Sequence, residues 1–437
     1  MLRSKTALLL LLCSSGLPAS AQAAGWSAPV TLGTSGASGF GEPGARVAVA
    51  EGDRLVAAWA NTHTSDLFAA AGRADGRLGA QRVGSGLRPA VAINRAGAAV
   101  VVFAEGRSLR AAVRAPGARR FGPARAITTP AARFDAADSP QVAADAAGRF
   151  VVLYERSSRT SGQYVTDVRA LTLTAAGRPT GEAQSFGEGD LPDRSEQALA
   201  DGRIVALIVL TTRPTPDTPV TFTRQLLRRD ARGAAFSATP IVTPKGFDAG
   251  QLTAAPDGRL ALAGLDITSS GDAGSAGRPL AAGFAEDAFG AFAGPTVRFP
   301  NRNFDPVAIP ADAGRVGLLW QQKTAPSDFE RAAPIVATTI GPGEGATPPT
   351  QLSARAAREP QAVTLPGGRG LAVWDDAGRW GGAELTADGS WRRVAAPSGR
   401  PSPFHDAITN RDLVASATGE AAFVWQERGR IRLSVRR

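Results

Sequence analysis

The segment Gly97-Ala-Ala-Val-Val-Val-Phe103 decides the fold, because its outline recurs along the whole chain. Eight times in 437 residues a glycine, replaced once by Asp53, is followed six residues later by the end of an apolar run. The runs end at Trp59, Phe103, Tyr154, Ile208, Gly264, Trp320, Trp374 and Trp425. Six of these eight residues are aromatic and their spacings are 44 to 56 residues, so the chain is an internal repeat.

Each repeat contains signals for four short strands. The clearest repeat, residues 89–127, has an alanine-rich strand at 89–93, a β-branched strand at 99–103, and two more at 109–114 and 124–127. Glycine-containing turns separate these strands. A period near 50 residues with four strands per repeat predicts an all-β fold, a single β-propeller.

The sizes of the side chains favour a ring of sheets. The first strands open at prolines such as Pro89, Pro140 and Pro360 and are rich in alanine, which suits strands that converge on an axis. The second strands carry Trp, Phe or Tyr, for which there is room where neighbouring sheets face each other at about 10 Å. The alternative is a row of β-sandwich domains, but this would give about 100 residues per repeat.

The two ends of the chain are complementary. The last repeat stops one strand short at residues 431–435, and residues 25–32 form a surplus strand with no inner strand before it. Pairing these two segments would satisfy both exposed edges. We therefore expect eight four-stranded blades, with the N-terminal strand closing the last one. Seven blades is the alternative, if one of the weakly patterned fourth and fifth repeats is an elaborated loop.

Residues 1–23 are predicted to be an export signal, which leaves residues 24–437 as the β-propeller domain. Arg3 and Lys5 form a basic start, 7–12 is an apolar run too short to span a membrane, and 21–23 reads Ala-Gln-Ala. Cys13, the only cysteine, lies inside this segment, so the mature chain would have no disulfide. A lipoprotein anchor at Cys13 is the alternative. We expect a secreted protein with no membrane span.

The formal net charge of +10 comes almost entirely from arginine. A nucleic-acid-binding protein should gather its basic residues on one face and interleave them with aromatic residues. Here the arginines are scattered through turns, as at Arg149, Arg203, Arg259 and Arg315. The pattern therefore predicts no nucleic-acid partner.

The motif Pro140-Gln-Val-Ala-x-Asp145-x-x-Gly148, followed by Val151-Val-Leu-Tyr154, resembles the sialidase-like or BNR-like repeats of secreted bacterial proteins. The resemblance covers essentially the whole mature chain and implies a propeller fold. It also implies either glycan cleavage or binding. The chain departs from sialidases in lacking a clear Asp-box, and its two tyrosines, Tyr154 and Tyr164, match no catalytic motif.

Polar residues follow the second strands and precede the first strands, and these positions share one face of a propeller. Carboxylates from several blades would surround the mouth of the channel there, where they could bind a cation or the hydroxyl groups of a sugar. The candidate ligand-binding residues are Glu105, Glu155, Asp266, Asp305, Glu359, Asp375, Asp376 and Glu427. The alternative is that strand ends facing solvent are simply polar.

No residue pattern indicates catalysis. His63 and His405 lack a spaced third metal ligand, and no nucleophile elbow or phosphate-binding loop is present. We therefore predict a monomeric, non-catalytic recognition or scaffold module, without a cofactor or metal, that binds a glycan or a protein at the channel mouth. The alternative is a sialidase-like, glycan-active hydrolase that uses carboxylates from several blades.

Overall fold

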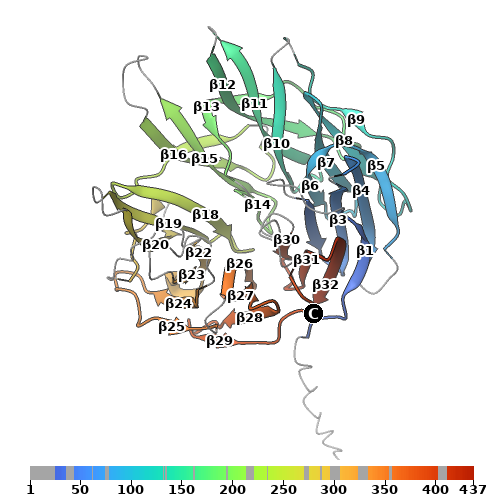
Figure 1. The fold of residues 1–437 in the computed structure, drawn as a ribbon. Coiled ribbons are helices and arrows are strands. Elements are labelled where there is room, and N and C mark those ends of the chain that lie inside the picture. Colours follow the sequence, from blue (N-terminus) through green and yellow to red (C-terminus); the bar gives the residue numbers. More distant parts are fainter. Residues whose placement is uncertain are drawn as a thin grey trace, which may run out of the picture.

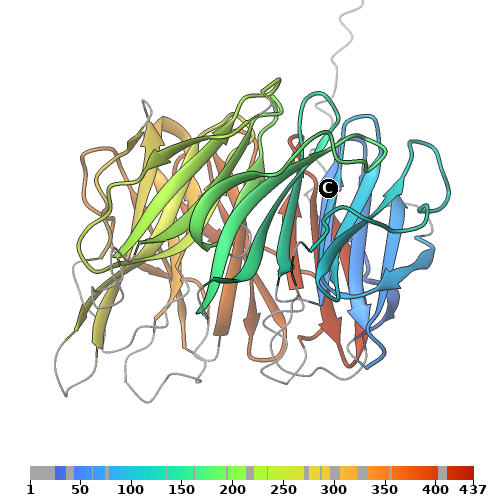
Figure 2. The same ribbon diagram turned by 90° about the horizontal axis from the view of Figure 1, so that it is seen from above.

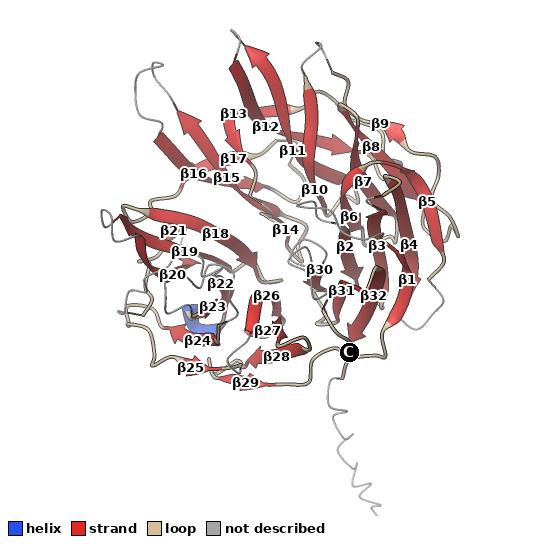
Figure 3. Ribbon diagram, viewed as in Figure 1, coloured by secondary structure: helices blue, strands red, loops and turns tan. Residues whose placement is uncertain are grey.

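The computed structural model is built almost entirely of antiparallel β-sheets (Figure 3). It describes residues 25–35, 44–61, 63–73, 78–130, 132, 135–160, 163–192, 195–212, 221–233, 235–269, 275–285, 288–295, 306–322, 333–353, 357–401 and 411–437. The expected export signal at 1–23 lies outside these residues. None of the described helices is long and apolar enough to cross a membrane.

Consecutive strands form a repeated four-strand unit, numbered here one to eight along the chain. Units one to three are β2 (Ala45–Ala50), β3 (Arg54–Asn61), β4 (Asp66–Arg73) and β5 (Ala80–Ser85); β6 (Leu87–Ile93), β7 (Ala99–Glu105), β8 (Ser108–Arg114) and β9 (Arg125–Ala126); and β10 (Ala136–Ala144), β11 (Phe150–Thr160), β12 (Gln163–Leu173) and β13 (Gln184–Asp190). Units four and five are β14 (Glu196–Ala198), β15 (Ile204–Thr212), β16 (Thr221–Arg229) and β17 (Ser237–Pro240); and β18 (Phe247–Ala254), β19 (Leu260–Ser269), β20 (Ser275–Ala285) and β21 (Ala288–Phe289).

Units six to eight complete the described chain. Unit six is β22 (Val307–Pro310), the short 3-10 helix η2 (Asp312–Gly314), β23 (Val316–Gln321), β24 (Ile335–Ile340) and β25 (Thr350–Gln351). Unit seven is β26 (Ala357–Leu365), β27 (Arg369–Asp376), β28 (Trp380–Leu385) and β29 (Trp391–Arg393). Unit eight is β30 (Arg411–Ala415), β31 (Ala421–Glu427) and β32 (Arg430–Arg436), joined by β1 (Val30–Thr34) from the start of the chain.

The units lie around a common centre (Figure 1). The first strand of each unit contacts the first strand of the next, and β30 contacts β2. Turns gather at the two ends of the strands (Figure 2). The turns between the first and second strands define what we call the first-turn face, and the turns between the second and third strands define the second-turn face.

The repeated glycine lies in the turn between the first and second strands. The eight residues at this position all have positive φ, from 59° at Asp53 to 100° at Gly419. Glycine adopts this left-handed conformation without steric cost, and aspartate tolerates it better than most residues. The spacing that defines the repeat is therefore set by backbone geometry.

The described core consists of eight apolar clusters, each formed between two neighbouring units. Except for Gly264, the residues that end the apolar runs of the second strands lie in these clusters. Trp59, Phe103, Trp320, Trp374 and Trp425 are each at most 1% exposed. Because every cluster needs two units, no unit can bury its apolar surface alone.

Unit five solves the same packing problem with different residues. Gly264 occupies the position that is aromatic in most repeats. A Cβ atom at Gly264 would lie 2.3 Å from Cζ of Phe247, a residue of β18 that is 5% exposed. The aromatic ring is thus supplied by the first strand of the unit, which explains why the sequence signal of this repeat is weak.

Units four and five both form four strands, as the repeat pattern predicted. The sheets differ from the expectation in one place: β13 pairs with β15 through Gly189–Leu210 and Asp190–Val209. Units three and four are therefore hydrogen-bonded into one eight-stranded sheet, whereas the other sheets have four strands. The long strands β11, β12, β15 and β16 extend far enough to make this contact possible.

The predicted pairing of the two chain ends is confirmed. Val30 pairs with Leu433, and Thr31 pairs with Arg432, in the antiparallel ladder between β1 and β32. Side chains add to the ladder: the Ser434 hydroxyl donates to the Ser27 carbonyl at 2.7 Å, and the Val435 amide donates to the Ser27 hydroxyl at 3.0 Å.

Candidate functional site

A cavity of about 360 Å³ lies among the first strands. First-strand and first-turn residues of seven units line it, those of unit six excepted. Many lining residues are alanine or valine, whose small side chains leave space between converging strands. The cavity reaches the first-turn face at Glu51, Arg95 and Ala146.

Buried polar groups interrupt the apolar lining of this axial cavity. Thr253 and Thr364 are each 5% exposed, and neither Oγ1 atom has a hydrogen-bond partner among the described residues. A buried hydroxyl without a partner costs free energy. Both oxygen atoms are covered by the surrounding protein, so they lie behind the surface that the cavity offers to a ligand.

Glu196 on β14 is the unusual acid of the cavity lining. Both of its carboxyl oxygens are buried. Burial raises the pKa of Glu196 well above its ordinary value, although the Arg229 guanidinium and the Leu153 amide act in the opposite direction. A carboxyl group that stays protonated can donate a hydrogen bond, which a carboxylate cannot do.

Asp412 on β30 also lines the cavity, but its carboxylate connects two units. Its Oδ2 atom accepts a hydrogen bond from the backbone amide of Val47 at 2.9 Å. This bond joins unit eight to unit one, 365 residues apart. The carboxylate of Asp412 therefore has a structural role.

The first strands are bulged near the second-turn face. Arg88, Ser139 and Glu359 have φ of 49° to 51°, a strained conformation for residues other than glycine, and a proline follows each of them. The sequence analysis placed these prolines at the opening of a strand, and that was wrong. The strands begin earlier, at Leu87, Ala136 and Ala357, and the prolines sit at register shifts.

Ion pairs between units connect the bulged residues. Arg88 Nη1 of unit two lies 2.7 Å from Asp138 Oδ2 of unit three. Arg411 of unit eight lies 2.7 Å from Glu359 of unit seven, and both side chains are largely buried. The strained residues therefore serve contacts between neighbouring sheets.

The sequence-predicted carboxylates lie at the second-turn face in separate local contacts. Glu105 pairs with Arg110, and Asp266 lies 3.0 Å from Arg278. Glu155 accepts a hydrogen bond from the Leu191 amide at 2.9 Å, and burial raises the pKa of its carboxyl.

The remaining candidates are similarly engaged. Asp375 accepts a hydrogen bond from the Gly378 amide at 2.8 Å, and burial raises the pKa of Asp375. Asp376 lies 2.9 Å from Arg393, and Glu427 lies 3.0 Å from Arg432. Asp305 lies outside the described residues. None of the seven described candidates lines the axial cavity.

The site residues predicted from the sequence include none of the polar residues that line the cavity, among them Glu196, Gln197, Gln251, Thr253, Thr364 and Asp412. They lie inside or at the start of first strands, where a single polar residue between small apolar ones is a weak signal. Only the repeat register could have indicated their common position.

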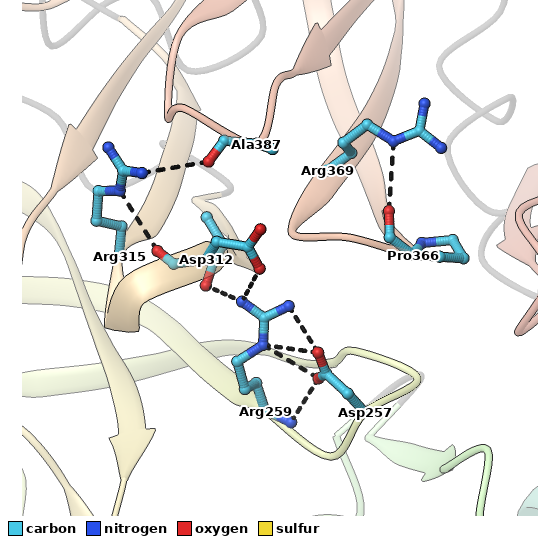
Figure 4. A network of polar contacts seen from close by, with 8 residues as sticks. Asp257, Arg259, Asp312, Arg315, Pro366, Arg369 and Ala387 are labelled. Atoms are coloured by element: carbon cyan, nitrogen blue, oxygen red, sulfur yellow. Dashed lines mark hydrogen bonds and ion pairs between the residues drawn. The ribbon is translucent and has the colours of Figure 1, made fainter.

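The arginines of the first turns are structural. Arginine follows the repeated glycine or aspartate in six units: Arg54, Arg149, Arg203, Arg259, Arg315 and Arg369. Figure 4 shows three of them at adjacent units. Arg259 lies 2.7 Å from Asp257 of its own unit and 2.9 Å from Asp312 of the next. Arg315 donates to the Ala387 carbonyl of unit seven at 3.2 Å.

The histidines do not form a described site. The backbone amide of His63 donates to Asn61 Oδ1 at 3.0 Å, and His405 lies outside the described residues. Within the described part of the chain, no cluster of three or more His, Cys, Asp or Glu residues could hold a metal ion.

Comparisons with known proteins give no family. No family model matches the chain, and no curated protein matches it. Similar solved structures include the BP39L lectin from Burkholderia pseudomallei (12% identity, 82% of this chain and all of that one, TM-score 0.47). A puromycin hydrolase matches with 17% identity over 88% of this chain and 58% of its own, at a TM-score of 0.46. An ulvan lyase matches with 10% identity over 71% of this chain and 81% of its own, at a TM-score of 0.42. At such scores these likenesses carry no functional argument.

Proposed function

We propose that the chain is an exported, monomeric β-propeller of eight blades that acts as a non-catalytic recognition module. The ligand is a glycan, and a terminal sugar enters the axial cavity. The contacts between successive first strands, with β30 against β2, support the closed ring. The pairing of β1 with β32 supports closure of the last blade.

The observation that carries this proposal is the axial cavity, with polar side chains among its lining residues. Its volume of about 360 Å³ lies in the range of small-molecule sites, about 300–1,000 Å³. Gln197 and Gln251 are among its lining residues, and a side-chain amide can both donate and accept hydrogen bonds. A sugar offers both donors and acceptors, so it can satisfy such groups without bringing a charge.

The test is a glycan array probed with purified protein lacking residues 1–23, together with a panel of chromogenic glycosides. We expect binding to at least one class of glycan and no hydrolysis. Ala198→Trp places a large ring at an exposed position of the cavity lining and should abolish binding. Ala115→Trp, at an exposed turn outside the cavity, is the matched control and should bind normally.

Two outcomes would overturn the proposal. Hydrolysis of any glycoside would favour the sialidase-like hydrolase instead. Equal glycan binding by Ala198→Trp and the unaltered chain would show that the ligand does not use the axial cavity.

A further inference from the structure

An open groove lies between units seven and eight at the second-turn face. It is lined by Arg379, Trp380, Pro397, Ser398, Gly399, Arg400, Glu427 and Arg428. These residues come from the β27–β28 turn, the connection that follows β29, and the β31–β32 turn. The groove shares no residue with the axial cavity.

Three exposed arginines dominate the charge of this groove. Arg379, Arg400 and Arg428 come from three separate segments, and their guanidinium groups make no hydrogen bond or ion pair with other described residues. The one acid, Glu427, is already engaged: its Oε1 accepts from the Arg400 amide at 3.0 Å and its Oε2 lies 3.0 Å from Arg432 Nε. Among the described residues, these three guanidinium groups therefore carry a positive charge without an ion-pair partner.

The backbone holds these segments in place. Arg428 and Gly429 have φ of 49° and 73°, so the β31–β32 turn is a tight hairpin of the type that requires positive φ at both central residues. Arginine is strained in this position. On the opposite side, a Cβ at Gly399 would lie 2.8 Å from Trp425, so the connection before Arg400 runs directly over the buried indole.

We propose that this groove binds the anionic groups of an acidic polysaccharide. Guanidinium groups bind carboxylate and sulfate oxygens through paired, charge-assisted hydrogen bonds. Bringing three of them together without a resident anion is unfavourable, and a bound oxyanion removes that repulsion. The groove lies at the second-turn face and is separate from the axial cavity. The inference therefore does not depend on a ligand in that cavity.

The groove favours a polysaccharide over a single-stranded nucleic acid. Nucleic-acid sites of that kind provide exposed aromatic rings on which bases stack. The aromatic ring of this groove, Trp380, is only 8% exposed and packs edge-on against Phe423 with ring centroids 4.8 Å apart. The exposed surface of the groove thus offers cationic groups and no stacking platform.

The experiment measures binding of dextran sulfate, polygalacturonate, unsubstituted dextran and single-stranded DNA at fixed ionic strength. The test variant is Arg379→Gln/Arg400→Gln/Arg428→Gln. The control is Arg119→Gln/Arg120→Gln/Arg125→Gln, which removes the same charge from exposed arginines of unit two. We expect the test variant to lose at least tenfold in affinity for one of the two acidic polysaccharides, and the control to change less than threefold.

The arms of the experiment separate the sources of the anion. Stronger binding of dextran sulfate assigns a sulfate ester, and stronger binding of polygalacturonate assigns a carboxylate. The inference fails if both triple variants lose affinity equally, if dextran binds as tightly as the polyanions, or if DNA shows the same loss. If the triple variant is unstable, Arg400→Gln alone replaces it. This single variant should keep the thermal midpoint of the unaltered chain and still bind the polyanion more weakly. Ala198→Trp should leave polyanion binding unchanged, which distinguishes this site from the axial cavity.

Discussion

At the scale of single residues, two substitutions of the repeat pattern are coupled in unit five. The position that ends the apolar run in β19 is Gly264, and the ring of Phe247 occupies the space that an aromatic residue fills elsewhere. The loss of the aromatic residue at position 264 is therefore compensated by Phe247 on the paired strand β18.

This coupling predicts the effect of one added methyl group. Gly264→Ala would place Cβ 2.3 Å from Phe247 and 2.4 Å from the Asp248 carbonyl, so we expect the free energy of unfolding to fall by about 1–3 kcal/mol. Gly290→Ala, where the nearest atom is 3.6 Å away, is the control. Urea denaturation monitored by tryptophan fluorescence measures both. Equal midpoints would contradict the close packing.

Glu196 makes stability depend on pH. Because burial raises its pKa in the folded protein, the folded state holds the proton more tightly than the unfolded state. The stabilisation is complete below the ordinary pKa of 4.5 and is lost as pH rises toward the folded-state value. We expect Glu196→Gln to remove this dependence, so that its thermal midpoint falls less between pH 5 and 8 than that of the unaltered chain. Parallel curves for the two proteins would be evidence against a buried, protonated Glu196.

At the scale of elements, the first turns connect neighbouring units through arginine. These side chains account for part of the high arginine content, and they act locally instead of forming a basic face. Figure 4 shows that Arg259 reaches from its own turn to η2 of unit six.

A pair of substitutions tests this role. Arg259→Ala removes contacts with both Asp257 and Asp312 and a hydrogen bond to the Ala311 carbonyl, and it should lower the free energy of unfolding by about 1–2 kcal/mol. Arg203→Ala removes an arginine at the same repeat position whose contacts are with Asp201 of its own turn, and it should cost less than about 0.5 kcal/mol. Chemical denaturation of the two variants would reject the idea if Arg203→Ala were the more damaging.

At the scale of the whole molecule, the closing contact joins residues that are about 400 positions apart in the chain. Thr31 and Arg432 are direct partners in the β1–β32 ladder, and the Arg432 guanidinium donates to the Thr31 hydroxyl. Separation of the two chain ends must break this ladder.

A disulfide across this ladder should stabilise the molecule. Thr31→Cys/Arg432→Cys in the chain without residues 1–23 introduces its only two cysteines. The oxidised form should gain about 2–4 kcal/mol, and its thermal midpoint should fall when a reductant is added. Thr31→Cys alone should show no effect of reductant. An oxidised double variant with the midpoint of the reduced one would mean that the ends separate after the rest has unfolded.

The sequence by itself determined the repeat, its strand order and the complementary ends, because backbone conformation and apolar periodicity act over a few residues. The glycine turns and the run at 97–103 carry that information locally.

Only the tertiary structure decided which side chains share a space. The carboxylates at the ends of second strands were predicted from local pattern, and each described one has its own nearby partner. Thr253, Thr364 and Glu196 all line the axial cavity because separate first strands converge there. Such convergence depends on distances between strands, which no local stretch of sequence encodes.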